Sequence, residues 1–97
     1  MAAGRAHAHF VGGQFQEAAT LAKKALARNP RSTRTLRILA ASLAKLGERD
    51  EASEVMREVL AIEPQLTISK MRARLNYWPE SVWNKFADGL RLAGLPE

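Results

Sequence analysis

The sequence of 97 residues contains no cysteine and no apolar run long enough to cross a membrane. The absence of cysteine excludes disulfide bonds, thiolate nucleophiles and zinc sites built on cysteine. A membrane-spanning helix needs about 20 consecutive apolar residues. Residues 1–11 contain two histidines and an arginine, which the core of a signal peptide does not carry. We therefore expect a soluble, cytoplasmic domain.

Negative charge is missing from one long stretch of the chain. Residues 18–47 contain no acid, and their bases are Lys23, Lys24, Arg28, Arg31, Arg34, Arg37 and Lys45. Residues 48–63 then carry six acids against two arginines, within a chain whose net charge is +5. Lysine and arginine can neutralise phosphates. Because the bases of the whole chain are spread over several expected helices with an acidic segment between them, and no RNA-binding aromatic motif is present, we expect no nucleic-acid partner.

Motifs for catalysis and for metal binding are also missing. The sequence has no serine, histidine and aspartate in a triad order and no glycine-rich loop that would hold a phosphate. His7 and His9 are two residues apart, so on a helix they point about 200° apart and cannot share an ion. We expect no cofactor, no metal ion and no enzymatic activity in this chain.

The chain does contain an internal repeat. Four residues recur 34 positions later: Gly13, Ala18, Leu26 and Pro30 return as Gly47, Ala52, Leu60 and Pro64. This period, with glycine at a turn and proline at the end, resembles the tetratricopeptide helix-turn-helix repeat. The resemblance implies an all-α fold, a right-handed superhelix of antiparallel helix pairs, and a role in protein binding.

Apolar residues at helical spacing predict six helices. Two of them cover about residues 3–11 and 16–28. The third is expected to be capped by Ser32 and ended by Gly47, with Leu36, Leu39, Ala40 and Leu43 facing inward. Asp50 is the expected cap of the fourth, which ends before Pro64.

The last two helices are expected over about residues 68–75, capped by Thr67, and from about Ser81 to Gly94. We divide the single domain, residues 1–97, into repeat one (3–30), repeat two (31–64) and a degenerate capping repeat (65–97). Trp78 and Trp83 are expected to cover the end of the apolar stack. The alternative is an exposed aromatic pair that anchors a partner.

The C-terminal residues carry a second resemblance. The segments Leu66–Ser69, Arg72–Leu75 and Gly89–Glu97 are similar to the C-termini of multidomain alphaproteobacterial proteins. In many of those, tetratricopeptide units follow a class III adenylate or guanylate cyclase domain or a DNA-binding regulatory domain. The resemblance implies that this chain is the C-terminal part of a longer bacterial signalling protein and contributes no catalytic residue to it.

The tetratricopeptide resemblance also implies a binding groove, lined by the first helix of each unit. The candidate groove residues are His7, Arg34, Arg37, Ala41, Lys45 and Arg72. Guanidinium groups pair well with carboxylates, so an acidic peptide is the expected ligand. Only Arg72 matches the family's carboxylate clamp, which disfavours chaperone tails. The alternative is a regulatory or oligomerisation segment without a peptide ligand, with a homodimer formed through the N-terminal end.

Overall fold

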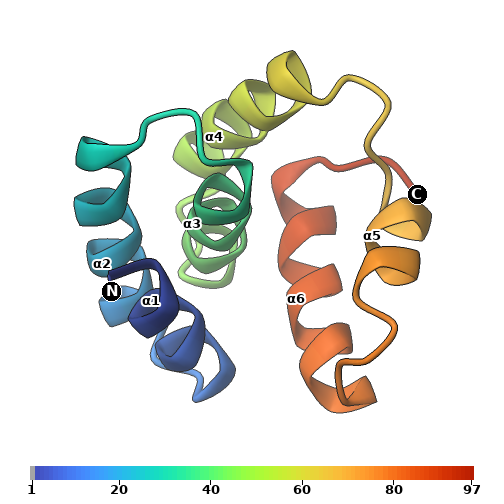
Figure 1. The fold of residues 1–97 in the computed structure, drawn as a ribbon, viewed down its shortest axis with the longest axis horizontal. Helices are drawn as coiled ribbons and strands as arrows, with labels where there is room; N and C mark the ends of the chain where they lie inside the picture. Colours follow the sequence, from blue (N-terminus) through green and yellow to red (C-terminus); the bar gives the residue numbers. More distant parts are fainter. Residues whose placement is uncertain (1) are drawn as a thin grey trace.

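The computed structural model describes residues 2–97, and the side chains of residues 5–97. This part of the chain forms six α-helices and no strand, so the predicted all-α fold is confirmed (Figure 1). The helices are α1 (Ala2–Val11), α2 (Phe15–Arg28), α3 (Thr33–Lys45), α4 (Arg49–Ile62), α5 (Ile68–Arg74) and α6 (Glu80–Ala93).

Most of the predicted helix ends are confirmed. The hydroxyl of Ser32 accepts the backbone N–H of Thr35 at 3.4 Å, and that of Thr67 accepts the N–H of Lys70 at 3.1 Å. Gly47, with φ of 85°, follows the C-terminal end of α3 in the left-handed conformation that glycine adopts without strain. Such local capping is readable from sequence because it depends on neighbouring residues alone.

The predicted cap of the fourth helix is wrong. Asp50 lies inside α4, and Glu48 is the residue that precedes the helix. The N–H of Glu48 bonds to the carbonyl of Leu43 at 2.9 Å and so closes the C-terminal end of α3, and α4 begins at the next residue, Arg49. Asp50 therefore acts as an acidic residue in the first turn, where it complements the positive end of the helix dipole.

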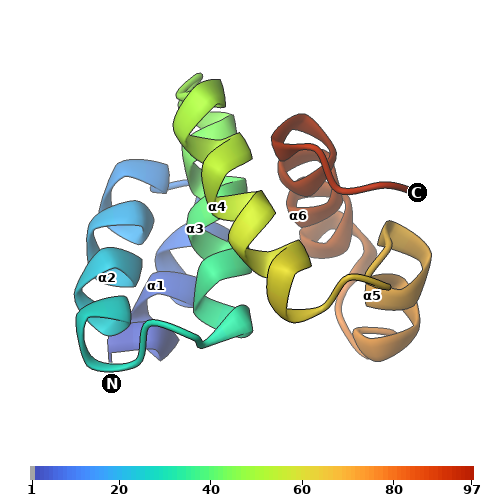
Figure 2. The ribbon, with the colours of Figure 1, turned by 90° about the horizontal axis from the view of Figure 1, so that it is seen from above.

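Helix α3 is the centre of the core. The four inward residues predicted for it are buried, and so are five more: Thr35, Ile38, Ala41, Ser42 and Ala44. Burial on nearly every side follows from its neighbours, because α3 packs against α2, α4 and α6. Figures 1 and 2 both show α3 and α4 between the α1–α2 pair on one side and α6 on the other.

The C-terminal helices do not repeat the arrangement of the first two pairs. Helix α6 packs extensively on α3 and less on α4, whereas α5 has few contacts with α6 (Figure 2). The start of α5 is held by the end of the chain, since the N–H of Ile68 bonds to the carbonyl of Pro96 at 2.8 Å. Trp83 is 6% exposed, as predicted for a residue covering the stack, while Trp78 is half-buried.

Candidate functional site

One side of α1 and α3 carries five residues that face the C-terminal part of the chain. We call this side the inner face and define it by His7, Phe10, Arg34, Arg37 and Ala41. Each set follows helical spacing, three residues apart in α1 and three then four apart in α3, which places its members on one stripe. Helix α6 and the α5–α6 connection lie against this stripe.

Helix α6 covers half of the inner face. A Cβ atom placed on Gly89 would lie 2.9 Å from the Cβ of Ala41, so the two helices cross there in direct backbone contact. The rings of Phe86 and Phe10 meet edge to face, with centroids 5.7 Å apart. The ammonium group of Lys85 donates to the carbonyl of Val11 at 2.9 Å. These contacts join α6 to α1 and to α3.

The burial of Ala41 corrects the expectation that it lines an open groove. Ala41 has no exposed surface, because Gly89 of α6 lies directly on it. The sequence placed this residue on the groove-facing side of the third helix, and it does lie on the inner face. What the sequence did not reveal is that the chain's own last helix occupies that part of the face.

The other half of the inner face is a pocket of about 480 Å³. Its lining combines two arginines and a histidine with aliphatic and aromatic side chains: His7, Arg34, Arg37, Ile38, Met71, Leu75, Tyr77, Trp78 and Phe86. Tyr77 is 74% exposed and Trp78 is half-buried. The pocket therefore offers positive charge and apolar surface side by side.

His7 lies between the charged and the aromatic parts of the pocket. Its ring meets that of Trp78 edge to face, with centroids 4.9 Å apart. Burial, and then the positive charge of Arg34, lower the pKa of His7 below its usual 6.5. At neutral pH the ring is therefore uncharged and can donate one hydrogen bond and accept another.

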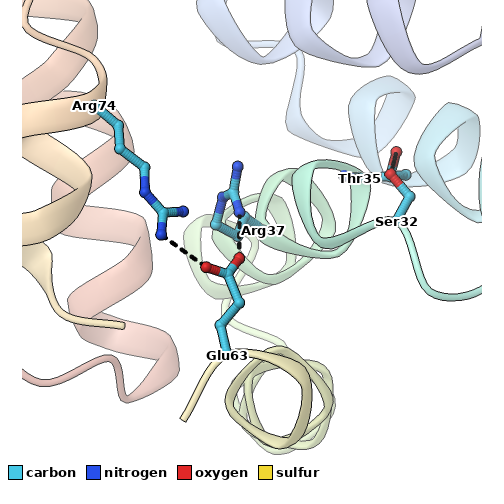
Figure 3. A network of polar contacts seen from close by, with 5 residues as sticks. All are labelled: Ser32, Thr35, Arg37, Glu63 and Arg74. Carbon is cyan, nitrogen blue, oxygen red and sulfur yellow. Dashed lines mark hydrogen bonds and ion pairs between the residues drawn. The ribbon is translucent and has the colours of Figure 1, made fainter. Parts of the chain in front are cut away.

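The two arginines of the pocket, Arg34 and Arg37, differ in their pairing, and Figure 3 shows the pairing of Arg37. Arg37 and Arg74 both bind the carboxylate of Glu63, at 3.3 Å and 2.8 Å respectively. The hydrogen bond from Arg74 is the main cause of the lowered pKa of Glu63. Arg34 is exposed and has no ion-pair partner among the described residues. It is thus the guanidinium group available to an added anion.

The other two predicted groove residues lie outside this pocket. Lys45 is half-buried at the C-terminal end of α3. Arg72 is exposed on α5, where its guanidinium carbon lies 5.4 Å from the ring centroid of Trp83 and its nitrogen 3.7 Å from the carboxylate of Glu80. The structure thus brings His7, Arg34 and Arg37 together and leaves Ala41, Lys45 and Arg72 apart from them.

The two histidines contact different neighbours. The Nδ1 atom of His9 bonds to the side-chain oxygen of Gln14, on the α1–α2 turn, while His7 faces Trp78. Across the described residues, no three histidine, aspartate or glutamate side chains come together in a group that could hold an ion. None of the helices in residues 2–97 has the length and apolarity needed to cross a bilayer.

The sequence did not indicate that the C-terminal part contributes residues to the pocket, although Trp78 was considered as an exposed anchor for a partner. Leu75, Tyr77 and Trp78 reach the pocket from the α5–α6 connection, and no local pattern indicates where a connection will lie. Gly89 did carry a signal. A glycine inside a helix lowers helix stability, so its presence often indicates a close packing contact.

The family described as tetratricopeptide repeat matches residues 12–75, which is more than half of the chain and extends from the α1–α2 turn to the end of α5. No curated protein and no solved structure matches. The family match agrees with the 34-residue recurrence and with the all-helical fold. The chain belongs to the tetratricopeptide repeat family.

Proposed function

We propose that this chain is a non-catalytic protein-interaction module that binds an acidic peptide segment in the inner-face pocket. Tetratricopeptide repeats typically mediate protein interactions, which supports the general role. The single observation that carries the ligand chemistry is the position of Arg34, an unpaired guanidinium among the described residues, on the wall of a pocket with aromatic surface. Arg37 adds positive charge behind it.

The lining favours a particular peptide chemistry. Arginine binds a carboxylate through two parallel hydrogen bonds, and this geometry is stronger and more selective than a single charge contact. Beside it, Trp78, Tyr77 and Leu75 offer apolar surface for a neighbouring large side chain. An acidic residue next to an aromatic or aliphatic one therefore suits the pocket better than a run of acids alone.

The experiment is a binding titration with fluorescent peptides in which aspartate or glutamate alternates with tryptophan, phenylalanine or leucine. Arg34→Glu is expected to weaken binding about tenfold or more, since it removes an attraction and adds a repulsion. Arg28→Glu is the matched control. Arg28 is exposed on α2, away from the residues that line the pocket, and its substitution changes the net charge by the same amount. Equal weakening by both variants, or no binding by the wild type, would reject the pocket as the site.

A second candidate is a regulatory or oligomerisation segment without a peptide ligand. The observation in its favour is that α6 already covers Ala41 and Phe10 of the inner face. A homodimer through the N-terminal end would need apolar surface on α1 or α2. The exposed large hydrophobic residues of the described part are Leu46, Tyr77 and Leu92, which lie elsewhere. Light scattering that finds a stable dimer without peptide would favour this second candidate.

We further propose that the units are residues 3–30, 31–64 and a capping unit 65–97, and that the module belongs to a cytoplasmic bacterial adenylate cyclase-like signalling protein. The support for this parent is the resemblance of the C-terminal sequence, from Leu66 to Glu97. The chain itself is expected to convert no ATP or GTP to a cyclic nucleotide. Cyclic product above the blank in an assay of the purified chain would contradict this assignment.

A further inference from the structure

The inner-face pocket is closed at one end by α6. On α3 the pocket extends to Ile38, and Ala41 in the next turn is completely covered by Gly89 of α6. On α1 the lining residue is His7, and Phe10 in the next turn is buried against α6. With α6 in place, an extended chain cannot continue along the inner face past this end. A compact molecule needs no second exit, so the shape of the pocket suits it.

The walls of the pocket are held by contacts within the chain. Arg37 of α3 and Arg74 of α5 share the carboxylate of Glu63, which ties the α5 wall to α3 (Figure 3). The ring of Trp78 lies against that of His7 on α1, with centroids 4.9 Å apart, and also packs on an aromatic ring of α6. A ligand that enters walls already in place spends little of its binding free energy on ordering them.

The size and the lining of the pocket are those of a small-molecule site. Its volume of about 480 Å³ lies within the range of about 300–1,000 Å³ that such sites occupy. They are lined mainly by apolar side chains, with a few polar groups that orient the ligand. Of the nine lining residues here, six are aliphatic or aromatic, three are basic and none is acidic. This lining favours a flat, apolar molecule that carries a negative charge.

The available positive charge lies beside the aromatic wall. Arg34 has no ion-pair partner among the described residues. Burial, and then the charge of Arg34, lower the pKa of His7, so the guanidinium group lies close to that ring. The same ring lies against Trp78. A carboxylate bound to Arg34 therefore brings the apolar part of a short ligand against the aromatic side chains.

We propose that the inner-face pocket is a receptor for a free small aromatic carboxylate, whose carboxylate binds Arg34 and whose ring lies against Trp78. The ligand uses the same groups as the acidic peptide, so the two exclude each other. The small molecule thereby controls when the interaction module is open to its partner. Only this control rests on the proposed function, because the small-molecule site itself does not depend on the peptide.

The test is isothermal titration calorimetry of the full chain with 1-naphthylacetate, which joins one carboxylate to a two-ring aromatic group. A ligand of this size is expected to bind with a Kd of about 0.1–1 mM. Arg34→Gln should weaken binding about tenfold or more, since a charge-assisted contact is lost. The matched control is Arg28→Gln, at an exposed residue of α2 outside the pocket lining, and it should bind as the wild type does.

Two further measurements locate the ligand. The neutral amide, 1-naphthylacetamide, should bind the wild type about tenfold more weakly than the carboxylate. Nuclear Overhauser effects from the naphthyl protons are expected to the ring of Trp78 and the methyl group of Met71. Equal affinity of acid and amide, or equal affinity of wild type and Arg34→Gln, would overturn the proposal. Nuclear Overhauser effects confined to Leu46 and Leu92, which are exposed outside the pocket, would also overturn it.

A competition experiment separates this inference from the acidic peptide. Displacement of the bound fluorescent peptide by 1-naphthylacetate would support both, and simultaneous binding of the two would overturn the control. Peptide binding that depends on Arg34, without binding of 1-naphthylacetate at about 10 mM, would overturn the small-molecule receptor and leave the peptide site. Binding of 1-naphthylacetate that depends on Arg34, without binding of any acidic peptide, would support the receptor and reject the peptide.

Discussion

Gly89 of α6 crosses Ala41 of α3 at a distance that leaves no room for a side chain. A Cβ on Gly89 would lie 2.9 Å from the Cβ of Ala41 and 3.0 Å from both its Cα and its carbonyl oxygen. Two of these three atoms are backbone and cannot move aside by changing a rotamer. The crossing fixes how closely α6 approaches the inner face. It thereby also fixes the position of Phe86, an α6 residue that lines the pocket.

We predict that Gly89→Ala destabilises the chain although alanine is the better helix former. Alanine gains about 0.5–1 kcal/mol over glycine inside a helix. Overpacking a close contact costs about 1–3 kcal/mol, so the loss outweighs the gain. Urea unfolding measures the difference in the free energy of unfolding. In Gly12→Ala the added Cβ meets ordinary contacts of 3.6 Å and 3.7 Å, and that control should stay within about 0.5 kcal/mol of wild type.

Helix α3 shows which part of the burial pattern can be predicted from the sequence. Its four predicted inward residues are buried, because periodicity records which side of a helix faces its neighbours along the chain. The burial of Ala41 could not be read in this way. Alanine is a small residue compatible with a groove, and Gly89 of the helix that covers it lies more than forty residues later in the sequence.

In the candidate site, too, the sequence identified the residues of the first two repeat units and not those of the C-terminal part. Arg34, Arg37 and His7 were identified because the repeat resemblance assigns them to the first helices, and all three line the pocket. Trp78 was identified only under the alternative of an exposed aromatic anchor, and Tyr77 was not identified, since both lie in the connection between two helices that do not form a regular repeat pair. Where such a connection runs depends on long-range packing, which a repeat pattern does not encode.

We predict that Glu63→Gln lowers stability at neutral pH and has no effect in acid. Glu63 binds Arg37 and Arg74, and these contacts hold the pKa of its carboxyl below the usual 4.5. A lowered carboxyl pKa adds stability above the unfolded-state value, and that stability is lost as the pH falls through the folded-state value. The expected loss at pH 7 is about 0.5–1.5 kcal/mol, measured by urea unfolding.

The control for this network is Glu54→Gln, a change of the same charge at an exposed residue of α4, the helix that ends just before Glu63. It should alter stability by less than about 0.5 kcal/mol at neutral pH. If wild type and Glu63→Gln were to differ by the same amount above and below the carboxyl titration range, the ion pairs would not be the cause. The loss would then come from packing of the side chain.

We predict that His7 makes the fold less stable as the solution is acidified from about pH 7.5 to about pH 5.5. Burial and Arg34 lower the pKa of His7 below 6.5, so the unfolded chain binds a proton more readily than the folded one. Acidification through this range therefore favours unfolding. His7→Gln should flatten the dependence of the urea unfolding midpoint on pH in this range. His9 is present in both proteins and does not contribute to the difference between them. Parallel profiles for the two proteins would contradict the prediction.

We predict that Arg72 stabilises the C-terminal part of the fold through Trp83 and not through Glu80. Its guanidinium carbon lies 5.4 Å from the ring centroid of Trp83, within the range of a cation–π contact, which contributes about 0.5–1 kcal/mol at exposed sites. The ion pair with Glu80 spans 3.7 Å between side chains that are 44% and 77% exposed, where such pairs add little. Arg72→Gln should therefore cost about 0.5–1 kcal/mol in urea unfolding, and Glu80→Gln less than half of that. Equal losses in the two variants would assign the stabilisation to the ion pair and contradict the prediction.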